Sequence, residues 1–222
     1  MSAGRITEAV NYYDLFLESE QDPEKRYQAW ERLLLIHLDI NRDVERGVSI
    51  LRTMSMEFEK EPEKIWSIYT RIGILYSSLK RHESAIDILE RAVHVAPDDK
   101  KQTRSYINLS QAHQAQSNFI KAIEALNQAR KMESYSLPEK QAEIDYLLGR
   151  IHYQEGSLEK AIQYLEKSYR IKENMNYRAK AGILLYDIYL EMENWKIAEQ
   201  ILIELEEFYP NPAVIRMRMQ QE

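Results

Sequence analysis

The 222 residues carry a formal net charge of −6, and 44% of them are hydrophobic and 30% charged, a composition typical of a folded chain rather than a disordered one. The acidic balance argues against a nucleic-acid-binding protein, which needs a basic surface. The absence of cysteine excludes disulfides, thiolate catalysis and cysteine-based metal sites. No apolar run approaches the ~18 residues of a membrane span, and the first residues lack a signal-peptide pattern. We therefore expect a cytoplasmic location without membrane insertion.

Prolines divide the chain into segments of similar length. Gly and Pro are scarce, at six each, and alternation of the kind found in strands is rare, so the chain is expected to be almost entirely helical. Prolines stand at positions 23, 62, 97, 138 and 210, and one is missing between the last two. A proline inside a helix costs ~3 kcal/mol or more. These prolines therefore mark junctions between helical segments.

A small residue recurs near positions 9, 47, 85, 122, 161 and 198, at steps of 37 to 39 residues. In the clearest case Ala85 is followed by Leu89 and Ala92, and the segment ends at Pro97. The equivalent pairs are Ala122 and Leu126, Ala161 and Leu165, and Ala198 and Leu202. Six positions separated by five near-equal steps over almost the whole chain indicate an internal repeat.

The repeated positions hold small and apolar groups, so they indicate packing rather than catalysis. Upstream of Ala85 lie Tyr69, Gly73 and Tyr76, and Gly149 occupies the position of Gly73 in a later copy. Small residues are expected where two antiparallel helices cross and their backbones approach closely. One such hairpin cannot bury its apolar face alone, so successive copies are expected to stack.

The segment from Trp66 to Asp99, with its aromatic, Gly, Ala, Leu and Pro positions, resembles the tetratricopeptide repeat (TPR). The other copies are longer than the usual 34 residues, and the surplus falls between units, as at residues 133–141. The resemblance implies an all-α fold, a right-handed α-solenoid of about five antiparallel helix hairpins with an extra helix at each end. The whole chain, 1–222, would form a single superhelical domain. Its parts would be a half-unit at 5–21, hairpins at about 24–61, 62–99, 100–137, 138–175 and 176–210, and a helix at 212–222.

The two end segments leave alternatives open. The first half-unit and the final helix would either cap the solenoid or belong to a longer array. The apolar face of the last paired helix, residues 195–208, would be covered by residues 213–222, or else would form an edge through which two copies associate. We expect the cover.

The resemblance also implies a concave groove lined by the first helix of each hairpin. Arg104, Arg150 and Lys180 would hold acidic or backbone groups of a bound peptide, and Tyr146 and Tyr153 would add apolar contact. The alternative is an ordinary solvated helix face. The full set of groove positions is Arg32, Thr70, Ile74, Arg104, Ile107, Asn108, Gln111, Glu143, Tyr146, Arg150, Tyr153, Lys180 and Asp187.

One subtype of the family binds a C-terminal carboxylate through a clamp of Lys and Asn, then Asn, then Lys and Arg on three successive first helices. Asn108 matches the middle position of this clamp, but Thr70 and Ile74 replace the first pair, and Glu143 and Leu147 replace the last. A carboxylate clamp is therefore not expected.

Catalytic and metal-binding patterns are missing from the sequence. No two of the five histidines have the i, i+4 spacing of a helical metal site, and neither a phosphate loop nor a nucleophile elbow is present. We expect no enzyme activity, cofactor or metal. The expected function is a scaffold or adaptor that binds a peptide segment or helix of a partner protein. The alternatives are a regulatory or substrate-recruiting module of a larger enzyme or secretion or assembly machine, and a scaffold that self-assembles through its terminal helices.

Overall fold

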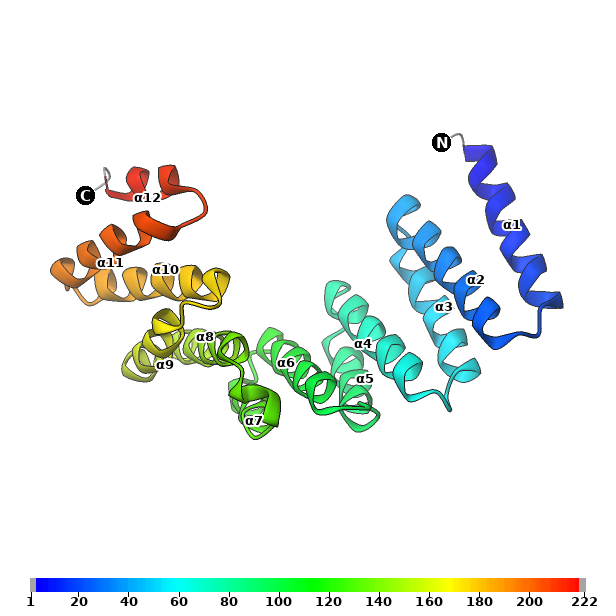
Figure 1. The fold of residues 1–222 in the computed structure, drawn as a ribbon, viewed down its shortest axis with the longest axis horizontal. Coiled ribbons are helices and arrows are strands. Elements are labelled where there is room, and N and C mark those ends of the chain that lie inside the picture. The colour runs from blue at the N-terminus through cyan, green and yellow to red at the C-terminus, as the bar shows by residue number, and fades with distance from the viewer. Residues whose placement is uncertain (1–2, 220–222) are drawn as a thin grey trace. The chain divides into compact units, whose positions relative to one another are not determined.

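The computed structural model describes residues 3–219, and every regular element in that range is a helix (Figure 1). The contacts divide the chain into two compact units, residues 1–97 and 98–222. The first unit contains α1 (Ala3–Ser19), α2 (Pro23–Leu35), the π-helical turn η1 (Ile36–Ile40), α3 (Val44–Glu57), α4 (Pro62–Ser78) and α5 (His82–His94). The second contains α6 (Asp99–Ala115), α7 (Phe119–Ala129), the 3-10 turn η2 (Glu133–Ser136), α8 (Pro138–Gln154), α9 (Leu158–Arg170), α10 (Met175–Glu191), α11 (Trp195–Phe208) and α12 (Pro212–Met219).

The helices pack in consecutive pairs, α2 with α3, α4 with α5, α6 with α7, α8 with α9, and α10 with α11. In addition, α1 contacts α2 and α12 contacts α11. The predicted all-α fold of repeated helix hairpins is thus confirmed.

Prolines begin four of the helices, at Pro23, Pro62, Pro138 and Pro212. The first helical position suits proline because its backbone N–H would have no partner there and its φ angle is already helical. The Asp22 carboxylate caps α2 by accepting hydrogen bonds from the N–H groups of Glu24 and Lys25, at 2.9 and 3.0 Å.

The turn inside each hairpin has the same backbone conformation. The five described residues with positive φ are Arg42, Lys80, Ser117, Gly156 and Glu193. Each stands five residues before the small residue of its repeat, where the first helix of the pair has just ended. Four of the five are not glycine, although the left-handed region is unfavourable for residues with a Cβ atom. The hairpin geometry therefore imposes this conformation on residues that do not prefer it.

The small repeat positions are where paired helices approach closely. Ala85, Ala122, Ala161 and Ala198 are fully buried. On the facing helix, a Cβ atom added to Gly73 would lie 2.5 Å from both Cγ and Cδ2 of Leu89. At the equivalent Gly149, it would lie 2.6 Å from Cγ of Leu165. Both contacts are too short for carbon atoms, so each glycine makes room for a leucine of the repeat.

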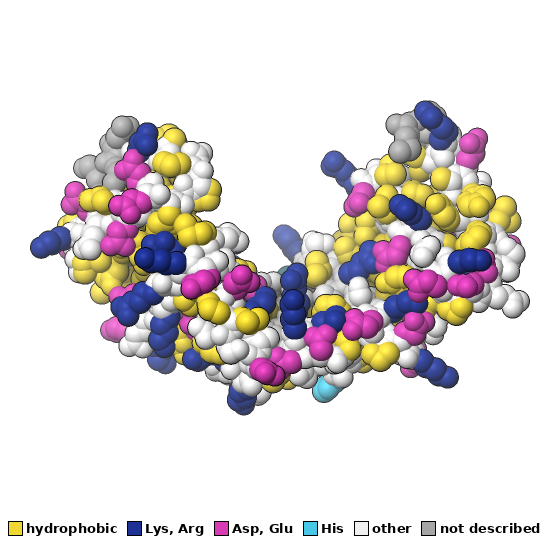
Figure 2. Space-filling view, viewed as in Figure 1, with side chains coloured by type: hydrophobic (Ala, Val, Ile, Leu, Met, Phe, Trp, Pro, Cys, Tyr) yellow, Lys and Arg dark blue, Asp and Glu magenta, His cyan; other side chains and the backbone are white. Residues whose placement is uncertain are grey.

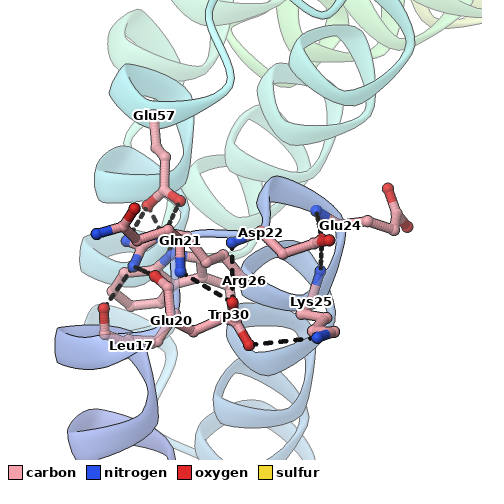
Figure 3. Close-up of polar contacts among 9 residues, drawn as sticks. All are labelled: Leu17, Glu20, Gln21, Asp22, Glu24, Lys25, Arg26, Trp30 and Glu57. Atoms are coloured by element: carbon pink, nitrogen blue, oxygen red, sulfur yellow. Dashed lines mark hydrogen bonds and ion pairs between the residues drawn. The ribbon is translucent and has the colours of Figure 1, made fainter.

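A network of polar contacts joins α1, α2 and α3 in the first unit (Figure 3). The Arg26 guanidinium donates to the carbonyl oxygens of Leu17 and Glu20 at the end of α1 and to the Glu57 carboxylate on α3. Trp30 Nε1 also donates to Glu57, at 2.9 Å. Because Arg26 satisfies carbonyl groups that the end of a helix leaves without partners, it fixes α1 against the first hairpin.

The surplus residues between the third and fourth hairpins form the short turn η2. The Asp99 carboxylate accepts hydrogen bonds from the N–H groups of Glu133 and Ser134, at 3.2 and 2.7 Å. The Thr103 and Ser134 hydroxyl oxygens are 2.6 Å apart. The insertion is therefore held against α6 by specific hydrogen bonds.

Helix α12 covers part of the apolar face of α11. Ile215 is fully buried in a cluster with Leu202 and Leu205, and Arg216 pairs with Glu206 at 2.7 Å. This agrees with the expectation that residues 213–222 cover the last paired helix, although residues 220–222 lie outside the described range.

Candidate functional site

The groove positions of the first unit are distributed over α2 and α4. Arg32 on α2 and Ile74 on α4 are exposed, whereas Thr70 is buried. Arg32 lines a shallow hollow of about 460 Å³ beside Tyr27 and Arg71. Arg71 forms an ion pair with Glu31 there, so part of the charge of this hollow is already matched.

In the second unit, helix α6 presents Arg104 and Gln111 to solvent. Ile107 is buried, at 2% exposure, in the core that α6 shares with α7 and α8. Asn108 is half-buried, and its side-chain nitrogen has no hydrogen-bond partner among the described residues. Thr70 and Ile107 thus offer little surface to a partner, while Arg104 and Gln111 offer much more.

Five of the predicted positions come together in one groove of the second unit, with a volume of about 760 Å³. We call it the C-terminal groove. Helices α8 and α10, which contact each other, form its floor and one side, and the turn between α11 and α12 forms the other side. Its lining residues are Tyr146, Arg150, Tyr153, Gln154, Met175, Asn176, Ala179, Lys180, Ile183, Leu184, Asp187, Tyr209, Pro210, Asn211 and Val214.

One end of the C-terminal groove is fixed by Tyr177. Its hydroxyl donates to the Glu143 carboxylate at 2.9 Å, and its ring lies 5.6 Å from the ring of Tyr146. Burial, and then the Glu143 charge, raise the pKa of Tyr177, so the hydroxyl keeps the proton that it donates. Lys140 also contacts Glu143, at 2.6 Å. Glu143 therefore supports the groove wall through two interactions of its own.

Arg150 is held in the middle of the groove by neutral groups. Its Nη2 donates to Gln114 Oε1 of α6 at 2.6 Å, and its guanidinium carbon lies 5.8 Å from the centre of the Tyr146 ring. Gln114 in turn donates to Gln154 at 2.5 Å. These contacts orient the guanidinium without neutralising its charge.

The remaining charged groups occupy opposite ends of the groove. Lys180 is exposed, and its ammonium lies 4.9 Å from the centre of the Tyr177 ring. Toward the other end lie Asp187 and Tyr153, and burial together with Glu191 raises the pKa of the Tyr153 hydroxyl. The groove thus combines apolar surface with Lys180 at one end, Arg150 in the middle and Asp187 toward the other end.

The side of the groove that follows α11 is the part that the sequence did not predict. Tyr209, Pro210 and Asn211 belong to the link between α11 and α12, and Val214 lies in the first turn of α12. The Pro-Asn-Pro sequence at 210–212 signals a turn, but nothing local shows that this turn lies beside α10.

The charged side chains of the described residues are dispersed rather than gathered into a metal site. Within residues 3–219, no three His, Cys, Asp or Glu side chains are grouped so that they could hold a metal ion. No helix in the same range combines the length and apolar character needed to cross a membrane. On the face shown in Figure 2, Lys and Arg side chains are interspersed with Asp and Glu side chains in both units. The arrangement suits recognition of another molecule by shape and local charge.

Comparison with solved structures shows TPR-type folds at low sequence identity. BtubC (BKLC) from P. vanneervenii has a TM-score of 0.68 and 16% identity, and the match covers 94% of this chain and 92% of that one. MamA, residues 41 to the end, from Desulfovibrio magneticus RS-1 has a TM-score of 0.63 and 16% identity over 85% and 96% of the two chains. The apo form of RapI has a TM-score of 0.73 and 13% identity over 91% and 60%. A search of curated protein sequences found no match.

Family models describe the central part of the chain. Two different tetratricopeptide repeat models match residues 65–132 and residues 107–176. The matches include the clearest repeat, with Ala85 and Leu89, and extend through α8 and α9. The chain therefore belongs to the tetratricopeptide repeat family.

Proposed function

We propose that this protein is a non-enzymatic interaction scaffold and that it binds a peptide segment or helix of a partner protein in the C-terminal groove. The observation that carries the proposal is the groove itself. About 760 Å³ of open space is lined by tyrosine, aliphatic and charged side chains that neighbouring residues hold in place. Tyrosine and arginine are enriched at protein interfaces because they combine a large contact area with a polar end.

Membership of a repeat family agrees with this proposal. Repeat positions such as Ala161 and Leu165 are fully buried and stabilise the hairpins. On the neighbouring helices α8 and α10, Arg150 and Lys180 line the groove instead of the core, so their side chains are available for contact. A scaffold requires this separation, because its surface must vary while its fold is kept.

The proposal is tested by capture of partners from a lysate of the source organism, followed by mass spectrometry. The groove variant is Met175→Glu/Lys180→Glu, which changes two exposed groove residues. The matched control is Ile120→Glu/Lys121→Glu, which makes the same kind of change on the exposed surface of α7, outside the groove.

We expect wild type and the control variant to capture the same proteins and the groove variant to lose them, with unchanged circular dichroism for all three. Retention of the same proteins by the groove variant would show that they bind elsewhere. Loss by both variants would show that general surface charge, rather than the groove, determines capture.

A further inference from the structure

The wall formed by residues 209–214 gives the C-terminal groove a second side, which a single helix face would not have. Ile215, directly after this wall, is fully buried against α11, and Arg216 is paired with Glu206. Proline on both sides of Asn211 restricts the backbone of the turn. A side chain that enters between α10 and this turn therefore meets a fixed surface on each side.

The interior of this pocket is suited to a bulky apolar side chain. Ala179 is buried at its base, and Ile183 and Leu184 of α10 and Val214 of the wall are half-buried around it. Pockets of roughly 300–1,000 Å³ are typical of sites that enclose most of a drug-sized ligand. The volume here has room for a large aromatic or aliphatic side chain together with its neighbours.

The charges of the groove then indicate which residues would flank such a side chain in a bound segment. Some arginines beside other hollows are paired with acids, as in Arg71 with Glu31, Arg91 with Asp87 and Arg170 with Glu166. Among the described residues, neither Arg150 nor Lys180 forms an ion pair. Both cations face the same groove in a protein whose net charge is −6.

The nearest acid on α8 does not neutralise them. Glu143 accepts its hydrogen bonds from Tyr177 and Lys140, and Arg150 is bonded to the neutral Gln114. Asp187 and Glu191 lie toward the other end of α10, near Tyr153. The part of the groove from Lys180 to Arg150 thus has the sign that attracts carboxylates, and complementary charge determines orientation and partner choice.

We propose that the occupant of the C-terminal groove is an acidic protein segment, with one bulky apolar side chain in the pocket and Asp or Glu residues beside it, facing Lys180 and Arg150. This inference rests on the proposed function, since it specifies the partner of the same groove. The apolar side chain fixes the position of the segment, and the carboxylates fix its direction along α10.

The test is selection of dodecapeptides from a random phage-displayed library on the intact protein, on Lys180→Glu and on the charge-matched control Lys121→Glu. Lys180 and Lys121 are both exposed, so both variants are expected to fold, which circular dichroism verifies. Wild type and Lys121→Glu should enrich peptides with a bulky apolar residue and Asp or Glu within three positions. Lys180→Glu should lose the acidic preference. A synthetic peptide from the wild-type selection should bind Lys180→Glu about tenfold more weakly.

A second substitution, Val214→Gln, changes the shape of the pocket wall without adding charge and should weaken binding of the same peptide. Enrichment of basic or uncharged peptides, or an unchanged acidic preference on Lys180→Glu, would overturn the inference and leave peptide binding itself intact. Failure to enrich any peptide on wild type would overturn the proposed function and this inference with it.

Discussion

The close approach of Gly73 to Leu89 leads to a prediction about whether a substitution at position 73 stabilises or destabilises the fold. Leu89 is 1% exposed, and its Cγ and Cδ2 atoms would lie 2.5 Å from a Cβ atom at position 73. Gly73→Ala should gain about 1 kcal/mol of helix propensity inside α4 and lose about 1–3 kcal/mol through overpacking. The net change expected for the single variant is a loss of up to about 2 kcal/mol.

The same substitution should become stabilising once Leu89 is truncated. Leu89→Ala alone should cost about 2–5 kcal/mol because it removes buried atoms and leaves a cavity. In that background the nearest atom to the new Cβ is Cγ2 of Ile88, at 3.3 Å. The truncation gives Ile88 room to move away from this Cβ atom, so Gly73→Ala should then add up to about 1 kcal/mol. The coupling free energy between the two sites is therefore about 1–3 kcal/mol.

The assay is urea unfolding of the wild type, both single variants and the double variant, followed by far-ultraviolet circular dichroism. Gly4→Ala serves as the control, because a Cβ atom at position 4 meets no atom within 4 Å and its effect should be the same whether Leu89 is intact or truncated. If Gly73→Ala has the same effect in both backgrounds, the steric explanation of the repeat glycine is refuted.

Two further predictions concern buried and partly buried carboxylates. Hydrogen bonds from Arg26 and then Trp30 lower the pKa of Glu57, so this stabilisation is present above the ordinary glutamate pKa and is lost as the pH falls through the lowered value. Glu57→Gln should reduce the free energy of unfolding at neutral pH by about 1–3 kcal/mol and flatten its acid dependence; an unchanged pH profile would contradict this. Burial raises the pKa of Asp145, which is 4% exposed with Tyr135 at 3.3 Å, although Arg130 and Lys167 oppose the shift. The charged form is therefore the less favourable one in the fold, and Asp145→Asn should stabilise the protein at neutral pH, with the difference vanishing below the ordinary aspartate pKa. Urea unfolding at both pH values measures this, and destabilisation at neutral pH would refute it.

The repeat period predicted the hairpins because it depends on a few steric requirements. Wherever two helices cross closely, a small residue must face a leucine, as Gly149 faces Leu165. These requirements recur at fixed spacing and are visible in one sequence. The positive φ values at Arg42, Lys80 and Glu193 were not predictable in this way, because the hairpin geometry forces charged residues into a conformation that their own preferences disfavour.

The candidate site was predictable only in part, for a related physical reason. The repeat register placed Tyr146, Arg150 and Lys180 on helix faces that do line a common groove. It gave Thr70 and Ile107 the same assignment, yet both are buried, because the distance between neighbouring helices decides whether a position remains open. That distance depends on long-range packing, which the register does not contain.

The wall at residues 209–214 shows how a groove common to repeats becomes specific to one chain. Each first helix of a hairpin presents a similar face, and in the second unit it is α10 that has the turn between α11 and α12 beside it. The burial of Ile215 fixes this turn in place, so the packing of the last helix determines the shape of the pocket. The charges of Arg150 and Lys180 then act on a pocket of fixed shape, and an electrostatic preference in such a site becomes selectivity for the position as well as the sign of a partner's charge.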